Sequence, residues 1–440
     1  MNLEFLFHQI LKPALGCTEP VAVALAASAA VQASAGWTPN SKVLPLPTVK
    51  EADVSAIRMR VSRNIFKNAF AILIPNAEGR KGIVMSAALG VFCDPRQGMG
   101  LFQNLDAELI RSADALVRSN RVQVSISEEA PSDLFIEVEV ELKGGRGECT
   151  IRDEHSNITC LKRNGAAIHG CDTIATGIAR YSPEVKALKG MNLSELMALV
   201  EDLPAGVLSL LRETIEKNVT ACKAGLTSPM GIGAGFFGTS GGAPVSVSQY
   251  VSSLTAAGSD ARMAGYPVEI MTSCGSGNQG IVATIPVVAY ARMHLLDEQR
   301  LLKALALSHL LTMYITTYVG YLSGLCGVAI KAGTGAACGL TYVMGGGVED
   351  VERAIKIMAA TLTGMICDGA KVGCALKVSS AADMAVRAAS LAMRKAEVPD
   401  DNGIVANTAE QTIENLAQLS RSMDVVDLKL IEIMLAKIPQ

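Results

Sequence analysis

The sequence of 440 residues has few aromatic side chains and almost no imbalance of charge. Aromatic residues make up 4% of the chain, with a single tryptophan, whereas glycine (40) and methionine (18) are abundant. A formal net charge of −3 provides no basic surface, so nucleic acid is not expected as a partner. A hydrophobic content of 50% is enough for a large core, which the composition predicts to consist of small residues and helices.

A leader for export is not recognisable at the N-terminus. MNLEFLFHQILK lacks a cationic start followed by an apolar run and a small-residue cleavage site. We therefore expect a cytoplasmic protein whose thiols stay reduced. The eleven cysteines are scattered and odd in number, which argues against the disulfide framework of a small secreted domain. Most are expected to be buried hydrophobes, but closely spaced ones more often bind metal or act in catalysis.

Charged residues are absent from Ala304 to Ile330, a run long enough to cross a bilayer. The run also contains His309, threonines and glycines, and its flanking charges show no bias toward one side. Central helices of a large helical domain can be equally apolar. We therefore favour a buried pair of helices over a membrane span, and a membrane transporter is the alternative of a different class.

The first part of the chain mixes helical and strand patterns. Helices are expected at 19–35 and 106–119, and strands at 55–62, 70–75, 122–127, 134–142 and 148–153. The stretch KGGRG, which starts at Lys143, predicts a hairpin turn between the last two strands. Together these patterns predict an α+β domain over residues 1–190.

Strand patterns nearly vanish after Asn192. Helices are expected at 194–201, 207–224, 304–330, 348–365, 379–395, 409–422 and 425–437. Glycine-rich breaks, which suit close approach of the backbone to a ligand, lie at 225–243, 273–280, 333–339 and 344–347. The second domain is thus expected to be all-α and to span residues 191–440.

Cys367 and Cys374 lie seven residues apart in GMICDGAKVGCALK, and Cys326 lies upstream in LSGLCG. The spacing is not that of a zinc ribbon, and the five histidines do not cluster. Three thiolates on glycine-containing segments suit an iron–sulfur cluster better than a hard cation. Three ligands would leave one iron open as a Lewis acid. On spacing alone, ordinary buried cysteines or a disulfide stay open as alternatives.

Cys17, in KPALGCTEP, precedes an Ala-rich segment that has Pro20 in its expected first turn. The N-terminus of a helix stabilises a thiolate, so Cys17 could be an activated base or nucleophile. The simpler interpretation is that Thr18 and Glu19 cap the helix while Cys17 packs in the core, and the local sequence favours it.

Polar residues in three further motifs suit the binding of a substrate. They are Lys67 and Asn68 in NIFKNAF, Asp260 and Arg262 in SDARMAGYP, and Asn278 and Gln279 in SCGSGNQG. The third motif offers backbone N–H groups to a carboxylate or phosphate, although it is not a Walker loop, and an arginine can grip a carboxylate. A solvated face, a surface ion pair or a tight turn explains these motifs equally well. His155, in DEHSN, is expected to be structural.

The motifs KPALGCTEP, SDARMAGYP, SCGSGNQG, LSGLCG and GMICDGAKVGCALKVS resemble, in the same order, those of the iron–sulfur L-cysteine desulfidases. These enzymes are distant relatives of the bacterial iron–sulfur L-serine dehydratases. The resemblance runs from about Lys12 to the C-terminus. It implies the fold of the serine dehydratases, an α+β domain packed on an all-helical domain that carries the cluster, and it is compatible with a homo-oligomer.

The resemblance also implies roles for single residues. Cys326, Cys367 and Cys374 match the three ligands of that family's [4Fe–4S] cluster, and Cys17 matches its proposed proton acceptor. The final residues, MLAKIPQ, contain no cysteine like the one that closes the open iron in some serine dehydratases. Water or Cys17 would then fill that position at rest.

The implied reaction is elimination of sulfide from L-cysteine, which gives aminoacrylate and then pyruvate and ammonia. The open iron would act as the Lewis acid and Cys17 as the base, so pyridoxal phosphate is not required. L-Serine dehydration is the nearest alternative, and a cluster that only senses oxygen is another. Cys274 and Cys338 match no required position and are expected to pack in the core.

Overall fold

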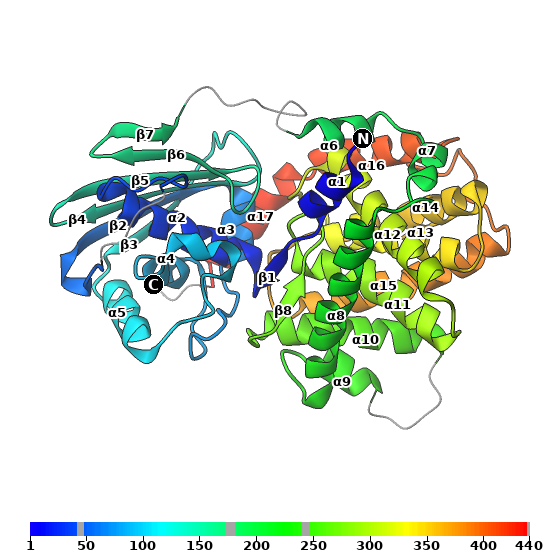
Figure 1. The fold of residues 1–440 in the computed structure, drawn as a ribbon, viewed down its shortest axis with the longest axis horizontal. Helices are drawn as coiled ribbons and strands as arrows, with labels where there is room; N and C mark the ends of the chain where they lie inside the picture. Colours follow the sequence, from blue (N-terminus) through cyan, green and yellow to red (C-terminus); the bar gives the residue numbers. More distant parts are fainter. Residues whose placement is uncertain (42–47, 172–180, 240–245, 438–440) are drawn as a thin grey trace.

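The computed structural model describes residues 1–41, 48–171, 181–239 and 246–437. Within them the chain has a part built around a β-sheet and a part built of helices, which lie side by side in Figure 1. This arrangement confirms the mixed fold predicted from the sequence. The boundary at residue 190 stays a prediction.

The sheet has, among the described residues, six strands in the order β3-β2-β4-β5-β6-β7. The strands are β2 (Val54–Val61), β3 (Val122–Ile126), β4 (Phe135–Leu142), β5 (Gly145–Arg152), β6 (Ile158–Arg163) and β7 (Ala166–Gly170). β2 and β3 run parallel, whereas the other neighbouring pairs are antiparallel. The hairpin predicted at Lys143 joins β4 to β5. The strand predicted at 70–75 is wrong: that segment is irregular, with an isolated bridge from Leu73 to Lys81.

One buried helix supports the sheet. The helices of this part are α2 (Thr18–Ser34), α3 (Arg63–Ala69), α4 (Ile83–Gly90) and α5 (Ala107–Arg118), with 3-10 turns η1 (Glu51–Asp53) and η2 (Pro95–Gly100). A Cβ at Gly147 of β5 would lie 1.8 Å from the carbonyl oxygen of Ala30 in α2, and one at Gly90 of α4 would lie 2.2 Å from that of Ala24. The two glycines therefore let α2 sit closely between the sheet and α4.

The helical part is centred on α12 (Glu298–Val319), which is buried over most of its length. Around it lie α6 (Pro183–Lys189), α7 (Leu193–Ala198), α8 (Ala205–Thr227), α9 (Ala234–Thr239), α10 (Val247–Met263), α11 (Gly277–Met293), α13 (Thr334–Val343), α14 (Val348–Leu362), α15 (Cys374–Met393) and α16 (Ala409–Arg421). In the described part of the chain, no helix has both the length and the apolar character needed to cross a membrane.

Two predictions for this part need correction. The run 304–330 holds one helix rather than a pair, because Gly320 (φ 96°) ends α12 and irregular chain leads to a π-helical turn, η4 (Val328–Gly333). The glycines of 333–339 are helical rather than a loop. Gly335 lets α13 approach α12 closely, since a Cβ there would lie 2.3 Å from the carbonyl oxygen of Ser308. Residues 240–243 of the predicted break at 225–243 lie outside the described residues.

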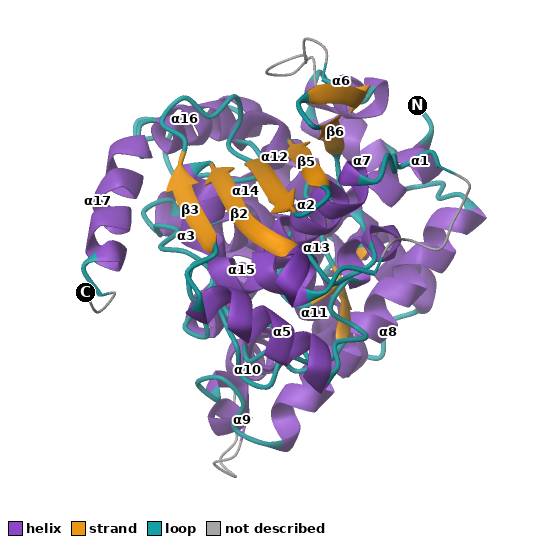
Figure 2. Cartoon of the chain, turned by 90° about the vertical axis from the view of Figure 1, so that its left-hand side faces the viewer, coloured by secondary structure: helices purple, strands orange, loops and turns teal. Residues whose placement is uncertain are grey.

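The two ends of the chain each join the opposite part. α1 (Leu3–Ile10) packs against α8 and α12 of the helical part. α17 (Asp424–Leu435) contacts α3 and lies at the side of the molecule where β3 forms the edge of the sheet (Figure 2). The Lys67 ammonium on α3 pairs with the Asp427 carboxylate on α17 at 2.7 Å, and both side chains are almost fully buried. The ion pair thus fastens α17 to the sheet part.

A disulfide joins Cys160 of β6 to Cys171, which follows β7. The expectation that every thiol is reduced is therefore wrong for this pair. Antiparallel pairing sets Cys160 opposite Gly170, so the next residue along the chain meets it. A separation of eleven residues in the sequence gives no sign of this contact.

Replacing Lys67 by methionine will leave the Asp427 carboxylate buried without its partner. We expect the free energy of unfolding, measured by denaturant titration, to fall by about 3–5 kcal/mol. Adding Asp427→Leu should recover most of the loss, because no charge is then buried alone. Arg212→Ala, which breaks an exposed ion pair with Glu298, is the control and should leave the free energy of unfolding nearly unchanged. A single Lys67 variant as stable as the wild type would contradict this role of the pair.

Candidate active site

A cavity of about 90 Å³ lies where the sheet part meets the helical part. Its walls come from segments that are far apart in the sequence. The first part of the chain contributes Cys17, Glu19, Asn68 and His155, and the helical part contributes Arg262, Asn278, Gln279, Lys331, Cys326, Cys367 and Cys374.

A small sheet brings two of the glycine-containing motifs together at this cavity. β1 (Pro13–Leu15) pairs antiparallel with β8 (Glu269–Met271), and the Thr272 N–H donates to the Lys12 carbonyl at 2.9 Å. Cys17 follows β1 directly, and the SCGSGNQG loop follows β8. The pairing therefore places the start of α2 beside the start of α11.

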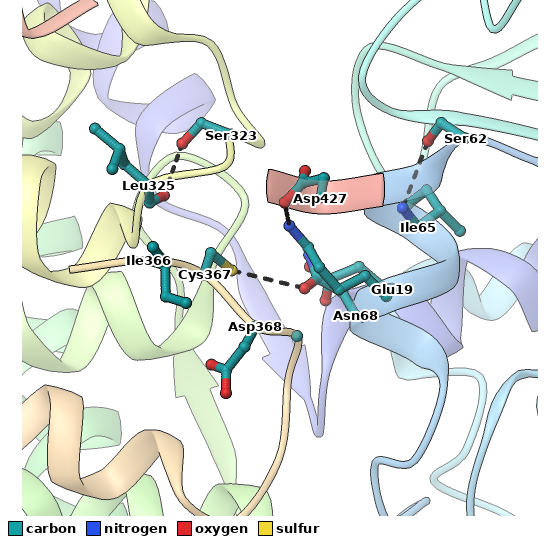
Figure 3. Close-up of polar contacts among 12 residues, drawn as sticks. Glu19, Ser62, Ile65, Asn68, Ser323, Leu325, Ile366, Cys367, Asp368 and Asp427 are labelled. Atoms are coloured by element: carbon teal, nitrogen blue, oxygen red, sulfur yellow. Dashed lines mark hydrogen bonds and ion pairs between the residues drawn. The ribbon is translucent and has the colours of Figure 1, made fainter. Parts of the chain in front are cut away.

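The second wall carries three cysteines on two hydrogen-bonded segments. The Cys326 N–H donates to the Met365 carbonyl at 2.8 Å, and the Cys367 N–H donates to the Gly324 carbonyl at 2.9 Å. Leu325 and Ile366 form the antiparallel bridge between these bonds, and both are drawn in Figure 3. Cys374 is the first residue of α15. The geometry thus sets Cys326 and Cys367 side by side, with Cys374 at the same cavity.

The donors that line the cavity include three cysteine thiols, the ligand type that holds iron–sulfur clusters. Within the described ranges, no group of three or more His, Cys, Asp or Glu side chains is close enough to hold one metal ion. In a cluster each thiolate binds a different iron, so the sulfur atoms lie farther apart than the ligands of one ion. Burial raises the pKa of Cys326 to about 12, and the neighbouring Cys367 thiol adds to the rise. A positive centre among the thiols would reverse this effect.

Opposite the cysteines, a chain of polar contacts reaches from Cys17 to Cys367. The Cys17 thiol donates to the Glu19 carboxylate at 3.2 Å, and the Asn68 amide donates to the same carboxylate at 3.1 Å. The Asn68 side-chain oxygen accepts from the Cys367 thiol at 3.9 Å. Figure 3 shows Asn68 and Glu19 facing Cys367 across the cavity. The two walls are therefore in direct contact through Asn68.

The surroundings of Cys17 favour the thiol over the thiolate. Burial raises the pKa of the Cys17 thiol well above its usual value, and the negative charge of Glu19 raises it further, while Arg262 acts in the opposite direction. A helix N-terminus contributes at most about 2 kcal/mol to a thiolate, which does not offset burial beside a carboxylate. Cys17 is thus a protonated thiol at neutral pH, hydrogen-bonded to Glu19, rather than an activated thiolate.

The remaining predicted substrate-binding residues divide into two groups. Arg262, Asn278 and Gln279 line the cavity, as does Asn68. Lys67 and Asp260 do not. The Lys67 ammonium donates to the Asp427 carboxylate. The Asp260 carboxylate accepts a hydrogen bond of 2.9 Å from the Gly235 N–H at the start of α9. Their polar side chains serve the packing of neighbouring helices, which sequence motifs do not distinguish from binding.

Several residues of the cavity were not among the predicted site residues, among them Glu19, His155, Cys274 and Lys331. His155 Nε2 lies 4.0 Å from the Glu19 carboxylate and has no hydrogen-bond partner in the described part of the chain. Cys274, expected to pack in the core, has the unusual φ of 50° for a residue with a side chain. For Lys331 a signal exists in the sequence, because it is the charged residue that directly ends the uncharged run 304–330.

Residues 157–431 match the model of the family described as serine dehydratase alpha chain. This range covers more than half of the chain. The chain belongs to this family. UPF0597 proteins of Alkaliphilus metalliredigens (strain QYMF) and Desulfatibacillum aliphaticivorans are each 35% identical to it, over 98% and 97% of this chain and 94% and 96% of their own lengths. The UPF0597 protein of Clostridium tetani (strain Massachusetts / E88) is 33% identical over 99% of both chains.

Membership of this family confirms the resemblance drawn from the motifs. The chain is a serine-dehydratase-like protein, and the family indicates a lyase associated with an iron–sulfur centre. The matched range contains Cys326, Cys367 and Cys374. Cys17 precedes that range but falls within the longer stretch shared with the UPF0597 proteins.

Glu19→Gln will lower the pKa of Cys17, because it removes the negative charge that disfavours the thiolate. We expect the midpoint of Cys17 alkylation by iodoacetamide, followed by mass spectrometry across a pH series, to move to lower pH. Cys93 is the internal control, since burial and Asp94, not Glu19, raise its pKa to about 12. A Cys17 midpoint that stays in place or rises would contradict the proposed hydrogen bond.

Proposed function

We propose that this chain is an iron–sulfur lyase that converts L-cysteine and water to pyruvate, ammonia and hydrogen sulfide. The observation that carries the proposal is the meeting of Cys17 with Cys326, Cys367 and Cys374 at one cavity. The motifs shared with the L-cysteine desulfidases support the choice of substrate.

Cys326, Cys367 and Cys374 would hold a [4Fe–4S] cluster, which supplies a Lewis acid at the iron that none of the three binds. The short ladder between residues 324–326 and 365–367 fixes the first two ligands, and the start of α15 fixes the third. Lys377 also lines the cavity and donates to the Ile366 carbonyl at 2.7 Å. Pyridoxal phosphate has no part in the proposal.

Cys17 would take the proton from Cα. The Cys17 thiol donates to Glu19 at 3.2 Å, but Glu19 is not the acceptor of this proton, because its contacts outweigh burial and hold its pKa below the usual value. The Cys17 sulfur would act as the base after its proton is released to water, a loss that the positive charge of Arg262 favours. The Cα–H bond then breaks toward Cys17, the Cβ–S bond breaks, and sulfide leaves with its electron pair. Aminoacrylate becomes an imine, and one water hydrolyses it to pyruvate and ammonia.

L-Serine dehydration is the second candidate, because the matching family model is described by that activity. The two reactions share the proton transfer and differ in the leaving group. Comparison of L-cysteine and L-serine on the same anaerobically purified preparation decides between them. Iron without pyruvate from either substrate would instead support a cluster that only senses oxygen.

Single substitutions of Cys326, Cys367 and Cys374 by alanine should each lower the iron content of the anaerobically purified protein and abolish release of sulfide and pyruvate. The control is Cys338→Ala, which removes a fully buried cysteine from α13 that does not line the cavity. We expect the control to keep its iron and its activity. Full iron in all three ligand variants would overturn the assignment.

Cys17→Ser should keep the iron but lower kcat by about 10²–10⁴-fold, because a hydroxyl is a far weaker base than a thiolate. The readouts are iron content and the initial rate of pyruvate formation at saturating L-cysteine. Normal turnover in this variant would remove Cys17 from the reaction.

A further inference from the structure

Lys331 is a buried cation at the wall of the cavity, and no carboxylate of the described residues pairs with it directly. Its side chain is 1% exposed, and it stands on the π-helical turn η4, a backbone form that is rare and frequent at functional sites. Among the described residues it forms no ion pair within 4.0 Å, although Cys274, Cys367 and Cys326 and, more weakly, Asp133 act on it electrostatically. Burial lowers the pKa of Lys331 to about 8, so most of the population remains charged at neutral pH.

The ammonium of Lys331 has hydrogen-bonding capacity to spare. It donates to the carbonyl oxygens of Gly320 at 3.0 Å and Tyr321 at 2.9 Å, just after the end of α12. An ammonium has three N–H donors, so within the described residues one is left without a protein acceptor. Two neutral carbonyls do not neutralise its charge. A buried charge is costly unless an opposite charge meets it, and a ligand of the cavity can provide one.

Gln279 stands next to Lys331 at the same point of the wall. Gly327, the residue after Cys326, has no side chain to fill the space in front of them. A Cβ on Gly327 would lie 3.1 Å from Lys331 Nζ and 3.1 Å from Gln279 Nε2. The other end of this amide, Gln279 Oε1, is buried and has no hydrogen-bond partner among the residues that the structure describes, and the same holds for the neighbouring Asn278 Oδ1. Cationic, donor and acceptor groups thus converge beside Cys326.

We propose that Lys331 and Gln279 bind the α-carboxylate of the amino-acid substrate, while Gln279 Oε1 and Asn278 Oδ1 accept hydrogen bonds from its α-ammonium group. The inference rests on the proposed function, because it takes the substrate to be a zwitterionic amino acid. The carboxylate provides the charge that Lys331 lacks, and the two amide oxygens gain the donors that they lack. Such a cradle orients Cα toward Cys17 without a direct role in the chemistry.

Binding of two small thiols tests the contact to the carboxylate separately from the contact to the ammonium group. 3-Mercaptopropionate carries the thiol and the carboxylate but no amine, and cysteamine carries the thiol and the amine but no carboxylate. Their binding to the anaerobic holoenzyme is measured by calorimetry, which does not require turnover. Lys331→Met should weaken 3-mercaptopropionate about 10–100-fold, the loss expected for a hydrogen bond to a charged group, and change cysteamine less than about threefold.

Lys331→Arg should restore part of the affinity for 3-mercaptopropionate, because it keeps the positive charge. Gln279→Glu should act with opposite sign on the two ligands, weakening 3-mercaptopropionate and strengthening cysteamine. Lys303→Met removes a lysine that does not line the cavity and pairs with Glu201, so it is the control and should leave both affinities unchanged.

Different results would overturn the carboxylate site and the lyase proposal. Equal affinity of wild type and Lys331→Met for 3-mercaptopropionate, or an equal loss for both thiols, would overturn the carboxylate site and leave the lyase proposal intact. A wild-type holoenzyme that releases pyruvate from neither L-cysteine nor L-serine would overturn the lyase proposal, whatever calorimetry shows for the two thiols.

Discussion

Two backbone hydrogen bonds, between residues 324–326 and 365–367, hold together the segments on which the site depends. One segment follows α12 and the other follows α14, so without this pairing Cys326 and Cys367 would have no common position. Leu325, which forms the bridge with Ile366, has a buried side chain that anchors this pairing in the core. Gly369 (φ 90°) then turns the chain so closely beneath α3 that a Cβ there would lie 2.4 Å from the Lys67 carbonyl. This contact sets Asn68 against Cys367.

The site exists at the junction of the two parts of the chain, and several contacts fix that junction. β1 and β8 join the start of α2 to the loop before α11, and the buried pair of Lys67 and Asp427 ties α17 to α3. Residues that never meet a reacting atom thereby decide the distance between Cys17 and the three other cysteines. Stability and the proposed chemistry are coupled here, because loosening the junction would move Cys17, the proposed base, away from the three cysteines that would hold the cluster.

The sequence predicts those helices and strands that have a local pattern, and it predicts the motifs that occur in the same order in a known family. Helix α2 follows from its alanine run, and the four cysteines named in advance do meet at one cavity. Contacts between distant segments left no such signal. The glycines of 333–339 pack helices instead of forming a loop, Asp260 binds a turn, and Cys160 meets Cys171 through sheet pairing. The role of Lys331 depends on the residues that surround it in space, and the periodicity of the sequence carries no information about them.

The central claim is that protein sulfur holds a cluster with one iron left for the substrate. Mössbauer spectroscopy of the ⁵⁷Fe-loaded, anaerobically purified chain tests it most directly, with and without L-cysteine. The account predicts about four iron atoms per chain, of which one changes its environment when the amino acid is added. Release of sulfide by a preparation that holds no iron, or whose spectrum does not respond to L-cysteine, would contradict it.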